Sequence, residues 1–206
     1  NNTVTGKNVS LVVKKTELNR ALNVIHGEIF GVSKKINIAI FGHGLVGGTL
    51  INQILESATA IEKRKDVKLN IFAIANSKNV LLNKNGVTPN WKNEIQNKGT
   101  LYTIQDVIDY ANEHHLENLI AIDNTASAEF VENYIPLIES SFDLISSNKV
   151  ANTLSYSFYK KLRKVLADNQ KTYLYETNVG AGLPLIDTIK LLHLSGENIT
   201  KIKGVF

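Results

Sequence analysis

Residues 36–47 read INIAIFGHGLVG, a mostly apolar run that passes directly into the pattern G-x-G-x-x-G. The run 36–41 is typical of a strand that is buried on both faces of a parallel sheet. After the glycines, apolar residues recur at helical spacing over 50–55. A strand, a glycine turn and a helix in direct succession predict the first unit of an α/β sheet of the Rossmann type.

The glycine turn has the composition of a phosphate site. Gly42 permits a tight turn, Gly44 lets a pyrophosphate approach the backbone, and Gly47 lets the helix pack close to the strand. Free N–H groups in the first helical turn, aided by the helix dipole, would face the anion. We therefore expect a dinucleotide at 42–47, and the alternative is a glycine-rich turn that binds no ligand.

The rest of the chain alternates between strand-like and helix-like segments. We expect a charged loop at 62–68, a polar excursion at 83–99, helices over 104–115 and 155–169, and strands over 69–75, 119–123, 142–146 and 172–176. This alternation predicts a doubly wound, mainly parallel sheet.

The end of the second strand indicates which dinucleotide is bound. An NAD-selective site usually has an acid there, which holds the ribose 2′-hydroxyl. This chain instead reads Ala75, Asn76, Ser77, Lys78. No carboxylate would repel a 2′-phosphate, and a hydroxyl and an ammonium group are available. We expect NADP(H) rather than NAD, and the alternative makes Lys78 an ordinary solvated lysine.

Composition narrows the function classes. The chain has no cysteine, which excludes disulfides, thiolate metal sites and cysteine nucleophiles. The net charge of +4 is spread along the chain, so no nucleic-acid surface is expected. No apolar run reaches the roughly 18 residues that span a bilayer. A cytoplasmic enzyme without a membrane partner is the simplest interpretation.

The two ends of the chain suggest a piece of a longer protein. A strand over 8–14 and a helix from Glu17 predict the end of a small α/β unit, followed by a linker at 33–35. The chain opens without a methionine, and 203–206 resembles an interrupted strand. We expect more protein on both sides.

Three strings resemble one family: DNTAS at 123–127, SNKVAN at 147–152 and NVGAGLP at 178–184. With their spacing behind the glycine turn, they resemble homoserine dehydrogenase. The string 75–78 and the segment before residue 32 resemble the bifunctional aspartokinase/homoserine dehydrogenases in particular. The resemblance implies the end of an ACT-like regulatory domain at 1–33, the NADP-binding Rossmann domain at 34–152, and the start of an α+β catalytic and dimerisation region at 153–206.

The resemblance also implies a reaction, the reversible NAD(P)-dependent interconversion of aspartate 4-semialdehyde and homoserine in the biosynthesis of threonine, methionine and isoleucine. By position, His43, Leu45 and Val46 would lie along the pyrophosphate and Thr125 near the nicotinamide. Asn148 and Lys149 would lie where cofactor and substrate meet, close beside the glycine turn. Lys149 is the expected catalytic residue, which polarises or positions the aldehyde.

Further family features follow by position. A monovalent cation such as sodium would be held by the backbone carbonyls of Glu176, Val179, Ala181 and Leu183, in a turn that leads into a helix near Pro184. The family forms homo-oligomers through its catalytic region. Its usual proton donor would lie beyond Phe206, so we expect this chain to bind NADP(H) weakly and to catalyse poorly. Relatives commonly have proline where this chain has Ser147, which predicts a looser loop.

Several alternatives stay open. The chain could be a regulatory or nucleotide-binding module without catalysis, or another NADP-dependent dehydrogenase on the same fold. His114 and His115 are adjacent at a helix end and fit the helix dipole better than a metal site. The His43 side chain is expected to be incidental. We expect Asp123 to support strand-end hydrogen bonds rather than to act as a base.

Overall fold

The computed structural model describes residues 12–15, 18, 21, 22, 25 and 34–204. The described part contains one seven-stranded sheet in the order β4-β3-β2-β1-β5-β6-β7. The strands are β1 (Lys34–Phe41), β2 (Val67–Ala75), β3 (Asn79–Leu82), β4 (Thr100–Leu101), β5 (Leu119–Asp123), β6 (Phe142–Ser146) and β7 (Tyr173–Leu174). Five strands are parallel, whereas β3 and β4 pair in antiparallel fashion at one edge. The predicted α/β sheet is confirmed, and its topology is Rossmann-like.

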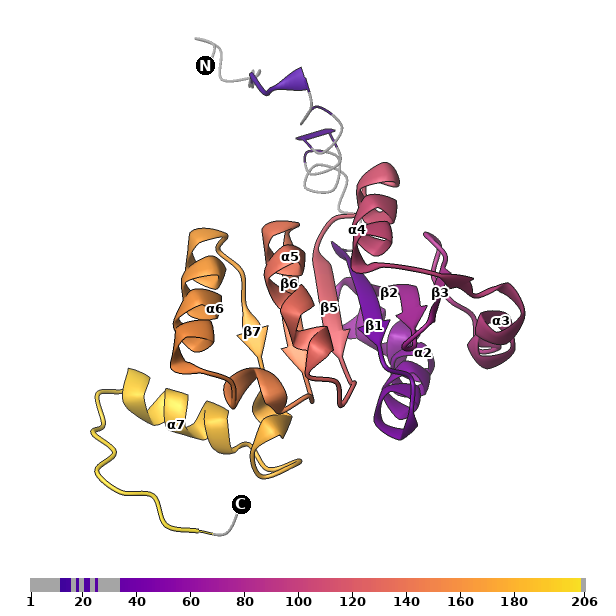
Figure 1. Ribbon diagram of the computed structural model, residues 1–206. Helices are drawn as coiled ribbons and strands as arrows, with labels where there is room; N and C mark the ends of the chain where they lie inside the picture. The colour runs from indigo at the N-terminus through magenta and orange to yellow at the C-terminus, as the bar shows by residue number, and fades with distance from the viewer. Residues whose placement is uncertain (1–11, 16–17, 19–20, 23–24, 26–33, 205–206) are drawn as a thin grey trace.

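Helices cover both faces of this sheet (Figure 1). They are α2 (Leu45–Lys65), α3 (Trp91–Lys98), α4 (Ile104–Glu113), α5 (Tyr134–Glu139) and α6 (Tyr156–Asp168), whereas α7 (Leu185–Leu194) lies beyond the end of the sheet. One core cluster packs α4, α5 and α6 against the sheet, and a second packs α2 and α3 against the opposite face. The doubly wound arrangement follows from these two clusters.

The register of the two central strands contains one irregularity. Ile38 is paired with Ile71, but Ala39 is paired with Ala73, so Phe72 is an extra residue in β2. As a result Phe72 and Ala73 both belong to the core on the α4 side, although neighbouring strand residues normally face opposite sides. The bulge sets where β2 ends relative to β1.

The segment 83–99 differs from its prediction as a polar excursion, because it contains α3. The residue that anchors it is Trp91, which is 1% exposed and donates from Nε1 to Asn52 Oδ1 on α2 at 3.0 Å. The prediction of a charged loop at 62–68 is also wrong. Helix α2 continues to Lys65, Asp66 in the left-handed region ends it, and β2 begins at Val67. Intrinsic helix propensity of the charged residues and the three basic residues in the last turn favour this extension.

The other predicted elements are present with small shifts in their ends. Among the described residues at the C-terminus, 199–204 contain no strand, so the strand expected at 203–206 is absent from Lys203 and Gly204. Most of the ACT-like unit expected at 1–33, with its strand over 8–14 and its helix from Glu17, lies outside the described residues. No helix in the described ranges is long and apolar enough to cross a membrane.

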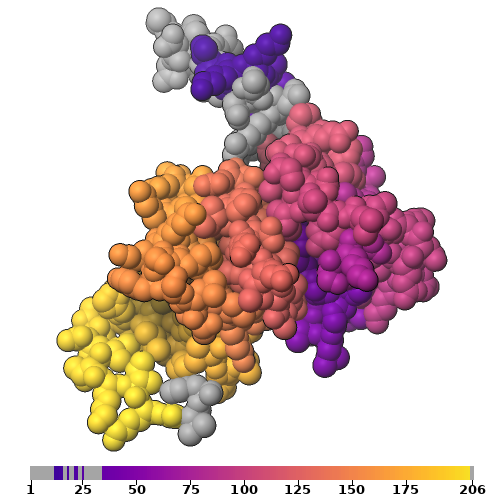
Figure 2. All heavy atoms as spheres, in the orientation of Figure 1, coloured from indigo at the N-terminus to yellow at the C-terminus, as the bar shows by residue number. Residues whose placement is uncertain are grey.

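Helix α7 and the residues that follow it form one end of the molecule, shown in yellow in Figures 1 and 2. None of the residues of α7 is buried, although the helix carries several leucines. Leu191 is 67% exposed and Leu194 is 80% exposed. This end of the structure therefore presents apolar side chains that the described residues do not cover.

Candidate functional site

The glycine turn between β1 and α2 has the geometry that its sequence predicts. Gly42 has a φ of +84°, and a Cβ there would lie 2.8 Å from the backbone of Asn124. A Cβ at Gly47 would collide with the carbonyl oxygen of Gly42. Both positions therefore require glycine, one for the turn and one for the close approach of α2 to β1.

The start of α2 is open in front of its free amides. A Cβ at Gly44 would meet no atom within 4 Å. Gly44 is the N-cap, yet no side chain caps the helix and its first turn has no acidic residue. Leu45 is 89% exposed and Val46 is 57% exposed. The unpaired N–H groups of this turn therefore face accessible space, which is the arrangement that binds an anion.

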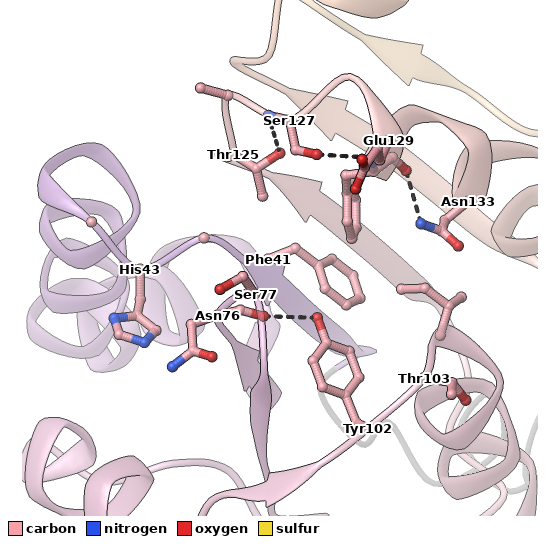
Figure 3. Close-up of a pocket in the computed structure, with 15 residues that line it drawn as sticks. Phe41, His43, Asn76, Ser77, Tyr102, Thr103, Thr125, Ser127, Glu129 and Asn133 are labelled. Atoms are coloured by element: carbon pink, nitrogen blue, oxygen red, sulfur yellow. Dashed lines mark hydrogen bonds between the residues drawn. The ribbon is translucent and has the colours of Figure 1, made fainter.

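A cavity of about 850 Å³ opens at this turn. It lies at the carboxyl ends of β1, β2 and β5. The strand order reverses here, because β2 lies on one side of β1 and β5 on the other. Open α/β sheets bind ligands at such a point. In Figure 3, Asn76, Ser77 and Tyr102 lie on one side of Phe41, and Thr125 and Ser127 lie on the other. The lining residues are Phe41, Gly42, His43, Gly44, Asn76, Ser77, Tyr102, Thr103, Ile104, Thr125, Ala126, Ser127, Glu129, Phe130 and Asn133.

The side chain of His43 is not incidental, contrary to our expectation. Its ring lies edge-on to Trp91 with 5.5 Å between ring centroids. The Nε2 atom is buried without a hydrogen-bond partner among the described residues. His43 therefore joins the glycine turn to α3, a contact between residues distant in sequence that no local pattern indicates.

The turn after β2 brings only part of the predicted string 75–78 to the cavity. Ala75 is fully buried in the sheet, whereas Asn76 and Ser77 line the cavity. Lys78 is exposed and is not among the lining residues. Tyr102, which the sequence did not indicate, donates from its hydroxyl to the carbonyl of Asn76 at 3.0 Å, and burial raises the pKa of Tyr102 to about 12.

Asp123 organises the opposite wall of the cavity. It is 3% exposed, and its Oδ1 accepts the N–H of Thr125 at 2.8 Å. Its Oδ2 lies 2.7 Å from the hydroxyl of Tyr134 and 3.0 Å from the side-chain amide of Asn148. Burial and the negative charge of Asp123 raise the pKa of Tyr134, which keeps that hydroxyl a donor. The expectation that Asp123 supports strand-end hydrogen bonds is confirmed.

Asn148 is the most connected of the predicted site residues. Its side-chain nitrogen also donates to the carbonyl of Ser127 at 2.9 Å and lies 3.4 Å from Thr125 Oγ1. Asn178 donates to the Asn148 carbonyl at 3.3 Å. Because Asn148 is 3% exposed, its amide shapes the loops after β5 and β6 rather than offering an open contact.

Lys149 follows Asn148 and is exposed, but it is not among the residues that line the cavity. Its loop is nonetheless close to the glycine turn. Ser147 donates from Oγ to Asn124 Oδ1 at 3.0 Å, and the side chain of Asn124 would be 3.4 Å from a Cβ at Gly47. Lys149 therefore lies two residues after Ser147, whose side chain is bonded to Asn124 beside the glycine turn.

Ser147 makes two bonds that a proline could not make. Besides the bond from Oγ, its N–H donates to the Asp123 carbonyl at 2.9 Å. Both bonds hold the loop against the end of β5, so the looser loop predicted from Ser147 has no support in the structure.

The turn predicted to hold a cation leads into α7 as expected, with Pro184 as the N-cap. The carboxylate of Glu176 accepts the N–H groups of Ile186 and Asp187 at 2.8 and 2.9 Å, and so caps α7 from a distance in sequence. The carbonyl of Glu176 accepts the N–H of Val179, and that of Leu183 accepts the N–H of Leu185. A carbonyl oxygen has a second lone pair, so these bonds do not occupy the predicted ligands fully.

The histidine pair sits at a helix end, as predicted. His114 is the C-cap of α4, and its ring contacts Tyr110 with centroids 4.3 Å apart. His115 has a positive φ of 50°. Within the described ranges, no group of three or more histidine, aspartate or glutamate side chains is arranged to hold a metal ion.

Comparisons with known proteins agree with this geometry. The family described as "Homoserine dehydrogenase, NAD binding domain" matches residues 42–176. A bifunctional aspartokinase/homoserine dehydrogenase of Buchnera aphidicola is 39% identical over 96% of this chain and 24% of its own length. A chloroplastic bifunctional enzyme of Zea mays is 31% identical over 97% of this chain and 22% of its own length. The chain thus spans about a quarter of the curated relatives that it matches.

Solved structures give the same fold. A Candida auris protein whose function is described as unknown has a TM-score of 0.68 and 25% identity, with 80% of this chain and 45% of that chain covered. A hyperthermophilic archaeal homoserine dehydrogenase in complex with NADPH has a TM-score of 0.59 and 23% identity, with 75% and 48% covered.

Proposed function

Because this chain belongs to the homoserine dehydrogenase family, through that family's NAD-binding domain, we propose that it holds NADP(H) for the reversible interconversion of aspartate 4-semialdehyde and homoserine. The observation that carries the proposal is the open, uncapped start of α2 at Gly44, which faces a cavity of about 850 Å³. Amides at 44–47 would bind the diphosphate, with Gly42, His43, Leu45 and Val46 around it.

The two walls of the cavity suggest the placement of the rest of the cofactor. Asn76, Ser77 and Tyr102 would surround the adenosine half, and Thr125 would contact the nicotinamide half. When bound, the dihydronicotinamide supplies the hydride that reduces the aldehyde. Asp123 and Asn148 hold the loops that bear Thr125 and Lys149. Lys149 would polarise the substrate carbonyl, since a developing alkoxide needs a nearby positive charge or proton donor.

The neighbouring regions remain proposals by family membership. Residues 1–33 would end an ACT-like regulatory domain, and 153–206 would begin the catalytic and dimerisation region. The leucines exposed on α7 fit a helix that another part of a longer protein, or a second copy, covers. A cation at the carbonyls of Glu176, Val179, Ala181 and Leu183 finds no support in the comparisons and stays a prediction. A cytoplasmic location also stays a prediction, because the Zea mays relative is chloroplastic.

Two measurements test the proposal. Calorimetric titration of the 206-residue chain should show binding of NADPH that is tighter than binding of NADH. Oxidation of homoserine by the same chain should be far slower than by a full-length bifunctional relative, because the chain spans about a quarter of the length of such relatives. Absence of binding of both dinucleotides would refute the proposed function, and turnover equal to that of the full-length enzyme would refute the expectation that this chain catalyses poorly.

A further inference from the structure

The hydrogen bonds of the turn after β2 show which side-chain atom of Asn76 is left for a ligand. Asn76 Oδ1 accepts the backbone N–H groups of Lys78 at 2.8 Å and Asn79 at 2.7 Å. Two N–H donors on one atom identify that atom as the oxygen, since a side-chain nitrogen could not accept them. The Asn76 backbone is also occupied, because its N–H donates to the Asn79 carbonyl at 2.9 Å and its carbonyl accepts the Tyr102 hydroxyl.

The remaining polar atom of Asn76 is its side-chain nitrogen, which carries two N–H donors. Asn76 lines the cavity and is half-buried. Figure 3 shows the Tyr102 hydroxyl bonded to the backbone carbonyl of Asn76, while the side-chain amide points toward His43. The residue follows β2 at the place where NAD-selective sites carry an acid that accepts from the ribose 2′-hydroxyl. In this chain the residue at that position is Asn76, whose side-chain nitrogen offers hydrogen-bond donors where an NAD-selective site has a carboxylate acceptor.

Other groups near this part of the cavity are less suited to a 2′-phosphate. Thr103 is the N-cap of α4, but both its N–H and its hydroxyl donate to the Asp106 carboxylate, at 2.6 and 2.7 Å. That carboxylate would also repel an anion. Lys78 is exposed and does not line the cavity. A solvated charge of this kind is screened and contributes little.

We infer that Asn76 is the residue that selects NADP(H) over NAD(H), and that its side-chain nitrogen donates to the 2′-phosphate with the Ser77 hydroxyl as a second donor. The selection depends on the turn, because the two bonds to Oδ1 hold the amide in one orientation. This inference rests on the proposed function, and it replaces Lys78 by Asn76 as the determinant of cofactor choice.

The substitution Asn76→Asp tests the inference with little change to the fold. One carboxylate oxygen can accept the same two N–H groups, while the other places a negative charge where the nitrogen was. The unfolding temperature should therefore stay within about 3 °C of wild type, because the change is at the surface of the cavity. The matched control is Lys78→Gln, which removes the nearby charge but leaves the turn unchanged.

Calorimetric titration with adenosine 2′,5′-bisphosphate and adenosine 5′-monophosphate isolates the 2′-phosphate. Wild type should prefer the bisphosphate by about 10- to 100-fold, as expected for one or two hydrogen bonds to a charged group. Asn76→Asp should abolish or reverse this preference, and Lys78→Gln should change it by less than about threefold. An aspartate variant that keeps the preference, or a Lys78→Gln variant that loses it, overturns the inference. If wild type binds NADPH but shows no preference, the inference fails and the proposed function stands; if it binds no dinucleotide, both fail.

Discussion

The carboxylate of Asp123 accepts a hydrogen bond from the side-chain amide of Asn148, with 3.0 Å between oxygen and nitrogen. Asp123 is the last residue of β5, and Asn148 lies in the loop that follows β6. The bond therefore joins the segment that carries Thr125 to the one that carries Lys149. Both partners are 3% exposed, so water cannot readily replace either of them.

Replacing Asn148 by alanine should destabilise the protein. The substitution removes the donor to the Ser127 carbonyl and leaves Asp123 Oδ2 with the Tyr134 hydroxyl as its remaining donor. We expect a loss of about 1–3 kcal/mol in the free energy of unfolding, measured by urea denaturation. Asn93→Ala, at an exposed asparagine of α3, is the control and should change stability by less than about 0.5 kcal/mol. Equal losses in the two variants would contradict this account.

Alanine at Gly44 and at Gly47 should separate binding from folding. Gly47→Ala drives a Cβ into the Gly42 carbonyl, so α2 must move away from β1 and the unfolding temperature should fall. Gly44→Ala meets no protein atom within 4 Å, so the fold should persist, but the methyl group would stand where the diphosphate approaches. NADPH affinity measured by calorimetry should drop about tenfold or more at Gly44. A Gly44→Ala chain that binds NADPH like wild type would argue against the phosphate site.

The start of α4 should respond to both mutation and pH. Thr103 and Asp106 form a capping box, and the two hydrogen bonds from Thr103 hold the pKa of Asp106 below its usual range. Thr103→Ala should cost about 1 kcal/mol and lower the melting temperature by about 2–4 °C. Because the folded-state pKa is lowered, the contribution of the Asp106 charge is complete above its unfolded pKa and is lost as pH falls through the lower folded value. The difference between wild type and Asp106→Asn in thermal melts should accordingly close in strong acid; a constant difference would refute the pH argument.

Trp91 should report cofactor binding. It is the single tryptophan of the chain, and its ring lies 5.5 Å from that of His43 in the glycine turn. Binding of NADPH at that turn should lower tryptophan emission by energy transfer to the nicotinamide. The midpoint of the fluorescence titration should match the dissociation constant from calorimetry. Unchanged emission at saturating NADPH would place the cofactor away from the turn.

Much of the fold was predictable because the central strands are continuous apolar runs. The strand at 36–41 and the glycine pattern behind it were sufficient to indicate the strand-turn-helix unit, since both faces of β1 are buried. Helix α3 could not be predicted in the same way. It is only eight residues long, and its position depends on the burial of Trp91 against α2 and His43, which are distant in sequence. Tertiary contacts of this kind override weak local preference.

The parts of the candidate site that a local sequence motif determines were predictable. The contacts between side chains from separate elements were not. The roles of Gly42 and Gly47 follow from spacing alone. The bond from Tyr102 to Asn76 joins residues on separate elements, and sequence gives no signal for it. The same holds for the Glu176 carboxylate, which caps α7 because the intervening turn reverses the chain.

The additional residue in β2 also gives this strand a place where its length can change. Phe72 has no counterpart in β1, and it faces the same side of the sheet as Ala73. Without Phe72, Ile71 would face the α2 side, Ala73 the α4 side and Ile74 the α2 side again, which is the regular alternation of a strand. Deletion of Phe72 should therefore keep the orientation of Ala75 and Asn76 at the cavity. Deletion of one residue from the regularly paired part of β1 has no such bulge to absorb it, and would turn the end of that strand over.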